Sequence, residues 1–295
     1  MKSKSTLFPG LSMFLCFCLL IGTGRLSYRF GGGAPLIAIS EAVSFLLPAL
    51  LLWRFGGVSG KKLKKRLQFR RLPRGGMGFT IKLGISIALV SLFLNLLIYQ
   101  ICGVTGADLS TTALDAPQTG LSLAGKLLVI VLLSAVVEEV FLRGTLFCTQ
   151  ERGACTGACL LLSGLAFAML HGSLMNFAGP FIAGVAYAYL TYSFGSIWPA
   201  VIAHTVNNLY YIFVVWITET YAAFGIWNYF AAINGLLLLL FLYLTLRAAE
   251  PLLVKGYLPH FQKGGLLYDA FLLVRNPGTI AFAAAFVAKA VFHWI

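Results

Sequence analysis

Long apolar stretches alternate with short polar segments along the whole chain. A helix that crosses a bilayer needs about 20 mostly apolar residues. Stretches of this kind lie near residues 7–25, 35–55, 80–102, 121–147, 157–172, 176–195, 197–217, 226–248 and 278–295. The stretch 157–172 is short for a span, and Lys289 and His293 interrupt the last one. The pattern predicts an all-α, polytopic bundle of about eight or nine transmembrane helices.

The composition supports an integral membrane protein. Of the 295 residues, 59% are hydrophobic and only 11% are charged, and the mean hydropathy is +0.89. Soluble domains contain about 25% charged residues. The six cysteines lie in or beside apolar stretches without zinc-like paired spacing, so we expect free thiols. We expect one membrane domain, with N-terminal helices in 1–120, a catalytic core in 121–217 and C-terminal helices in 218–295.

The net charge of +13 comes largely from one loop, KKLKKRLQFRRLPRGG, at residues 61–76. Basic loops mark the cytoplasmic side of a membrane and attract anionic lipid head groups. The loop lacks the aromatic interleaving and the binding module typical of nucleic-acid partners, so none is expected. Alternation then puts the N-terminus, the turns near 149–156 and 196, and the segment 247–277 inside, and the loop 105–120 outside. We expect a multi-pass protein of a bacterial cell membrane.

Three acidic residues fall inside predicted spans: Glu41, Glu138 and Glu139. A charge at the centre of a bilayer costs at least ~3 kcal/mol, so each of them needs a reason. Glu139 and Arg143 are four residues apart and share a helix face, which predicts an ion pair. Glu138 is turned by about 100° from Glu139 and points elsewhere. Glu41 has no motif around it, and we expect it to pack between helices or to line a cavity.

Helix geometry permits Glu138 to meet three polar residues from other spans. From the inner turns, a rise of ~1.5 Å per residue puts Glu138 roughly 20 Å deep and His171 roughly 25 Å deep. The same arithmetic puts His204 and Asn208 at roughly 12 and 18 Å. Side-chain length and helix tilt cover these differences. All four side chains can therefore meet in one intramembrane cavity.

Three motifs in this region resemble those of the CPBP family. The motifs, which lie within roughly residues 120–215, are Glu138-Glu139-x-x-x-Arg143, Phe167-x-x-x-His171 and His204-x-x-x-Asn208. They agree with the family in their order, in residue type and in the kind of span that carries them. The family joins the type II CAAX prenyl endopeptidases with bacterial relatives implicated in bacteriocin processing and self-immunity.

The resemblance implies an intramembrane glutamic endopeptidase that acts on a hydrophobic or lipidated peptide or protein, without a metal or another cofactor. Glu138 would be the general base that activates water, assisted by His171. His204 and Asn208 would donate hydrogen bonds to the tetrahedral oxyanion, and each such donor contributes ~3–4 kcal/mol. Three further residues would support the motif helices: Glu139, Arg143 and Phe167.

Three other functions remain open at this point. Two histidines and a glutamate can bind zinc and leave a position for water, although the usual H-E-x-x-H helix is absent. The protein can also be a non-enzymatic immunity factor or regulator that keeps the motifs as architecture. The third alternative is a transporter that relays protons through its buried acids, but paired broken helices are not evident.

Overall fold

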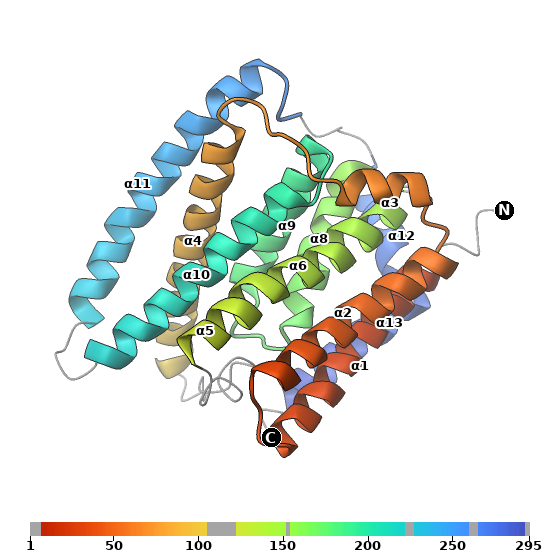
Figure 1. Ribbon diagram of the computed structural model, residues 1–295, viewed down its shortest axis with the longest axis horizontal. Coiled ribbons are helices and arrows are strands. Elements are labelled where there is room, and N and C mark those ends of the chain that lie inside the picture. Colours follow the sequence, from red (N-terminus) through yellow and green to blue (C-terminus); the bar gives the residue numbers. More distant parts are fainter. Residues whose placement is uncertain (1–6, 105–121, 152–153, 222–226, 260–264, 293–295) are drawn as a thin grey trace.

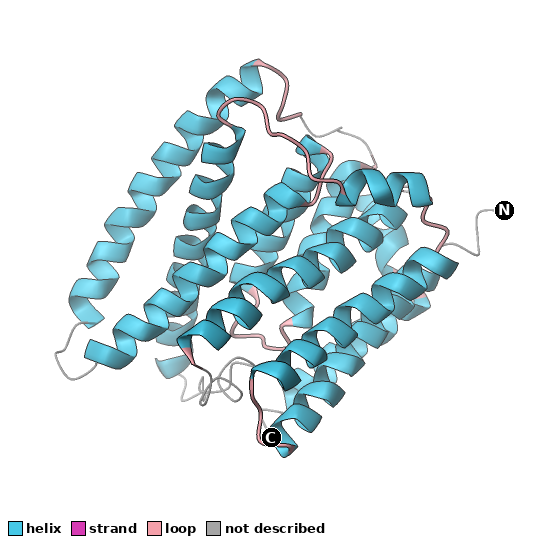
Figure 2. Cartoon of the chain, in the orientation of Figure 1, coloured by secondary structure: helices cyan, strands magenta, loops and turns pink. Residues whose placement is uncertain are grey.

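The computed structural model describes residues 7–104, 122–151, 154–221, 227–259 and 265–292, and every regular element in these ranges is a helix (Figures 1 and 2). The loop predicted at 105–120 and His293 lie outside the described residues. The long helices follow the predicted apolar stretches. They are α1 (Leu7–Arg29), α2 (Ala34–Phe55), α4 (Gly76–Val104), α8 (Thr156–Leu170), α9 (Ala178–Phe194), α10 (Trp198–Tyr221), α11 (Trp227–Val254) and α13 (Pro277–Phe292). Two short helices, α3 (Gly60–Leu67) and α12 (Leu266–Val274), complete the set outside the central segment.

The described helices do not confirm the predicted number of spans. Five described helices are long and apolar enough to cross a membrane: α1, α2, α4, α10 and α11. The pair α12 and α13, bent by 76°, would be a sixth. The helix α8 has 15 residues, hence a length of about 22 Å, which is less than the ~30 Å hydrocarbon core. The chain is therefore an integral membrane protein, but eight or nine spans are not confirmed.

The predicted stretch 121–147 forms one continuous helix that alternates between two kinds of turn. Its consecutive parts are α5 (Leu123–Gly125), η1 (Lys126–Leu133), α6 (Ser134–Glu139), η2 (Val140–Leu146) and α7 (Phe147–Gln150). In the η parts the turns are wide, so that the amide of Ser134 bonds to the carbonyl of Val129, five residues earlier. Wide turns of this kind are frequent at functional sites. We call this element the α5–α7 helix.

The α5–α7 helix lies inside the bundle, with α2 on one side and α10 on the other (Figure 1). The helices α4 and α11 pack together beyond α10, and α1 packs on α2 and α13. The helices α8 and α9 approach closely because Gly164 faces Gly184, where an added Cβ would lie 2.7 Å from the Cα of Gly164. Small residues allow helix backbones in membranes to touch in this way. This contact brings the end of α8 towards the α5–α7 helix.

Segments predicted to share the cytoplasmic side gather at one end of the bundle. Glu151, at the turn after α7, makes ion pairs with Lys62 at 2.7 Å and with Arg66 at 2.8 Å. The hydroxyl of Ser196, before α10, donates to the carbonyl oxygen of Gln68 at 2.8 Å. The basic loop therefore contacts both turns that the alternation places on its own side. Which side of the membrane this end faces remains a prediction.

A reporter fused within 61–76 is expected to report the cytoplasm, and one fused within 105–120 is expected to report the outside. The reason is the excess of Lys and Arg in the first loop and their absence from the second. The measurement pairs a fusion enzyme active only outside with a fluorescent protein that folds only inside. The reverse pattern would overturn the orientation.

Candidate active site

Two neighbouring cavities meet at Glu138. The first, cavity A, has a volume of about 290 Å³ and is lined by all the residues predicted to be catalytic: Glu138, His171, His204 and Asn208. The second, cavity B, has about 210 Å³ and lies among residues of α1, α2 and α13. Glu138 and His171 line both cavities. The folded chain thus brings together the four side chains that the sequence placed on three separate spans.

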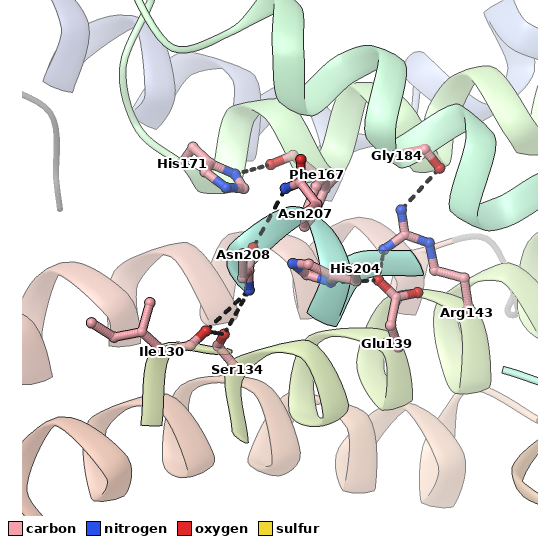
Figure 3. A network of polar contacts seen from close by, with 10 residues as sticks. All are labelled: Ile130, Ser134, Glu139, Arg143, Phe167, His171, Gly184, His204, Asn207 and Asn208. Carbon is pink, nitrogen blue, oxygen red and sulfur yellow. Dashed lines mark hydrogen bonds and ion pairs between the residues drawn. The ribbon is translucent and has the colours of Figure 1, made fainter. Parts of the chain in front are cut away.

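Glu139 is the centre of a buried polar network (Figure 3). Its Oε1 accepts hydrogen bonds from Nη1 of Arg143 at 2.8 Å and from Nδ1 of His204 at 3.0 Å. Nη2 of Arg143 donates to the carbonyl oxygen of Gly184 at 2.9 Å. Glu139 and Arg143 are both fully buried, and the ion pair predicted from their spacing is present. Because a buried charge is tolerated only when paired and hydrogen-bonded, this network ties the α5–α7 helix to α9 and α10.

Aromatic rings enclose the same network. The Arg143 guanidinium lies 4.9 Å from the ring centre of Phe167 and 5.5 Å from that of Tyr187. Phe167 also meets the rings of His171 and His204 edge to face, at 4.7 and 5.4 Å. Tyr187 stacks on His204 at 5.0 Å. Phe167 therefore contacts Arg143 by cation–π attraction and both imidazoles by edge-to-face packing.

Both histidines are anchored through Nδ1, but to different acceptors. His171 ends α8, and its Nδ1 lies 2.8 Å from the carbonyl oxygen of Phe167. Since a carbonyl only accepts, Nδ1 carries the proton and Nε2 keeps a lone pair in the neutral ring. His204 donates from Nδ1 to the carboxylate of Glu139, which leaves its Nε2 on the side away from Glu139 (Figure 3). Gly172 follows His171 with φ +68°, a left-handed conformation that ends the helix at this histidine.

Asn208 lies one turn after His204 and is anchored to the α5–α7 helix. Its Nδ2 donates to the carbonyl oxygen of Ile130 at 3.0 Å and to Oγ of Ser134 at 3.3 Å. The hydroxyl of Ser134 also donates to the Ile130 carbonyl. Ile130 lies in the wide-turn part η1, and its carbonyl oxygen accepts hydrogen bonds from the side chains of Ser134 and Asn208. Ile130 and Ser134 are themselves hydrogen-bonded, so both acceptors lie on the same side of Nδ2 and share one amide hydrogen of Asn208.

Glu138 and Glu41 differ from Glu139 in having no polar partner. Neither carboxyl group forms a hydrogen bond or an ion pair with another described residue, and Oε2 of Glu41 is buried and unsatisfied. Glu41 lines both cavities together with Glu138, so its cavity-lining alternative is the one observed. In the described part of the chain, no three His, Cys, Asp or Glu side chains are grouped as metal ligands.

Some residues around the site were not singled out from the sequence. Tyr187 lies in the segment AYAYLTY, where nothing in the pattern distinguishes it from its neighbouring tyrosines. Ser134 lies four residues before Glu138, and this spacing on one helix face was the available signal. Polar residues in apolar stretches were also a signal for the remaining lining of cavity A, which includes Ser91, Asn95, Asn176, Asn207 and Tyr210.

Comparison with known proteins identifies the segment that forms this site. Residues 120–210 match the family model described as type II CAAX prenyl endopeptidase Rce1-like. Neither the curated proteins nor the solved structures gave a significant match. The matched segment runs from the α5–α7 helix into α10 and contains all three motifs. The match supports the CPBP family prediction made from these motifs: residues 120–210 of the chain are similar to the type II CAAX prenyl endopeptidases of that family.

Proposed function

We propose that this protein is an intramembrane endopeptidase that hydrolyses peptide bonds in a hydrophobic or lipidated, membrane-associated peptide or protein. Its family implies a protease, and the family description names prenylated substrates. The observation that carries the proposal is cavity A, where Glu138, His171, His204 and Asn208 line one space inside a membrane protein. An intramembrane carboxylate without a counter-ion is itself a sign of function.

Glu138 is the general base in this proposal. Its carboxyl group lines the cavity and is free of hydrogen bonds to other described residues, so it can accept a proton from water. The lone pair on Nε2 of His171 can accept the second hydrogen of the same water and so orient its oxygen. Glu139 cannot take this role, because it is fully buried and its Oε1 already accepts from Arg143 and His204. The geometry favours Glu138 over its neighbour.

His204 and Asn208 stabilise the oxyanion that forms when water attacks the carbonyl carbon. The Glu139 carboxylate orients His204 through Nδ1, and Nε2 can donate to the oxyanion when the ring carries a second proton. Asn208 donates the amide hydrogen that is not bonded to Ile130 and Ser134. Catalytic hydrogen bonds often form only with substrate in place.

Purified protein in lipid discs is expected to cleave members of a library of apolar and prenylated peptides, whereas Glu138→Ala is expected to cleave none. Products are identified by mass spectrometry, which also gives the cleaved bond. Activity is expected to survive a chelator, because the proposed water activation uses a carboxylate. One tightly bound zinc ion per chain that is required for turnover would instead move Glu138, His171 and His204 into ligand roles. A protein that binds a library member without cutting it would contradict the enzyme.

A further inference from the structure

Of the three acidic residues inside the spans, only Glu139 has a counter-ion among the described residues. Arg143 is ion-paired with Glu139, which compensates that charge. Glu41 and Glu138 have no ion pair with any described residue, yet they line the same two cavities. Two carboxylates in one apolar space cannot both be ionised without a high cost, so at least one of the two is expected to carry a proton. One of these two groups is therefore available as an acid while the other acts as a base.

Glu41 lies on α2, which packs against the helix that carries Glu138. Both residues line the two cavities, and the place where the cavities adjoin is called the passage. The helix α2 packs against η1, α6 and η2, and Figure 1 shows it running alongside them. On α2, Ile37 and Glu41 are one turn apart, and both line cavity A and cavity B. Across from this face, Glu138 and His171 also line both cavities. A peptide that occupies both cavities would therefore lie near both Glu41 and Glu138.

The reaction also needs an acidic proton at the leaving nitrogen. Hydrolysis of an amide requires a proton on the leaving nitrogen, because an amide anion is too poor a leaving group to depart. In the proposed mechanism the Nε2 proton of His204 is engaged with the oxyanion, and Nε2 of neutral His171 carries no proton. Glu138 gains its proton only as water attacks, whereas Glu41 can hold a proton before the reaction starts. A neutral carboxylic acid at Glu41 would therefore be a separate donor for the leaving nitrogen.

We propose that Glu41 is the general acid of this enzyme and protonates the leaving amine; this step rests on the proposed endopeptidase function. Glu138 removes a proton from water as the oxygen attacks the carbonyl carbon. The carboxylic acid of Glu41 then donates its proton to the nitrogen as the C–N bond breaks, which releases an amine and a carboxylic acid. Glu41 is left as a carboxylate, and the proton on Glu138 passes to it across the passage. Both side chains return to their starting states, and no further reactant is consumed.

The test compares Glu41→Gln with the parent on a peptide and on its matched p-nitrophenyl ester. Glutamine keeps the size of the side chain but has no acidic proton. On the peptide, kcat is expected to fall by about 10²–10⁴, with KM little changed. The ester leaves as a stable anion and needs no acid, so Glu41→Gln is expected to cleave it at about the parent rate. Glu138→Gln is expected to be impaired on both substrates, because both need an activated water.

Three further variants test folding, the need for an acid at position 41, and a rival acid. Ser44→Ala alters the same helix at a buried hydroxyl that contacts Thr23 and lines neither cavity, so its activity is expected to match the parent. Glu41→Asp keeps an acid and is expected to recover part of the peptide activity. Lys289 lines cavity B and also carries a proton, so Lys289→Gln is tested in the same way. Its peptide and ester rates are expected to fall together or not at all.

Three results would overturn the assignment of Glu41. They are parent-like peptide cleavage by Glu41→Gln, an equal loss on peptide and ester, and a peptide-specific loss in Lys289→Gln. Failure of the parent to cleave either substrate would refute the endopeptidase itself, which separates that outcome from failure of this step. Thermal unfolding of each variant in detergent is measured alongside, so that a rate lost through misfolding is recognised by a lowered Tm.

Discussion

Glu138→Gln is expected to abolish peptide cleavage while the protein stays folded and inserted in the membrane. The amide cannot accept the proton of the attacking water. Loss of a general base typically lowers the rate ~10²–10⁴-fold, and kcat is expected to fall by this factor. Folding is expected to survive because Glu138 makes no hydrogen bond or ion pair with another described residue that the change would break. The measurement is kcat on a cleaved peptide together with Tm in detergent.

The adjacent variant Glu139→Gln is the matched control, and its expected defect is different in kind. Oε1 of Glu139 holds both Arg143 and His204, so the neutral amide leaves a fully buried guanidinium without its counter-charge. Breaking a buried pair in this way costs ~3–5 kcal/mol, and Tm is expected to fall together with the rate. If Glu138→Gln cleaves normally while Glu139→Gln is well folded and inactive, the two roles have been exchanged.

Asn208→Ala is expected to bind the peptide almost as well as the parent and to cut it about 10²–10³ times more slowly. An oxyanion donor acts in the transition state, so its loss appears in kcat rather than in KM. Asn208 also holds α10 to the α5–α7 helix through Ile130 and Ser134, and this structural part has to be separated from catalysis. Binding is measured with a non-cleavable analogue, and kcat and KM are measured by product formation.

Two neighbours of Asn208 serve as controls. Ser134→Ala removes one acceptor of Asn208 but keeps the amide, so a catalytic role predicts only a small loss of rate. Asn207→Ala changes the adjacent amide on the same cavity and is expected to retain most activity. A defect in Ser134→Ala as large as that in Asn208→Ala would indicate that Asn208 acts by anchoring α10. A non-enzymatic immunity protein would cleave nothing, and its protection of cells would survive both Glu138→Ala and Asn208→Ala.

The sequence by itself determined the helical class, the positions of the long helices and the Glu139–Arg143 ion pair. Apolar stretches of this length have to be helical in a membrane, where each backbone group must find a partner within its own segment. The ion pair is equally local, because residues four apart on one helix are neighbours whatever surrounds them. The family followed from motifs that need no three-dimensional information. The helices, the ion pair and each single motif depend on residues close together in the chain.

Only the tertiary structure decided which motif residues contact one another. The apolar residues surround these helices on all sides, so the pattern does not specify how each helix is rotated about its axis. Packing sets that rotation, and it turns His204 towards Glu139, stacks Tyr187 on the imidazole and brings Glu41 to the passage beside Glu138. The length of helix α8 also became clear only in the folded chain, where its 15 residues are followed by His171 as the C-cap. Contacts between helices distant in sequence are a property of the packed bundle, and local patterns do not encode them.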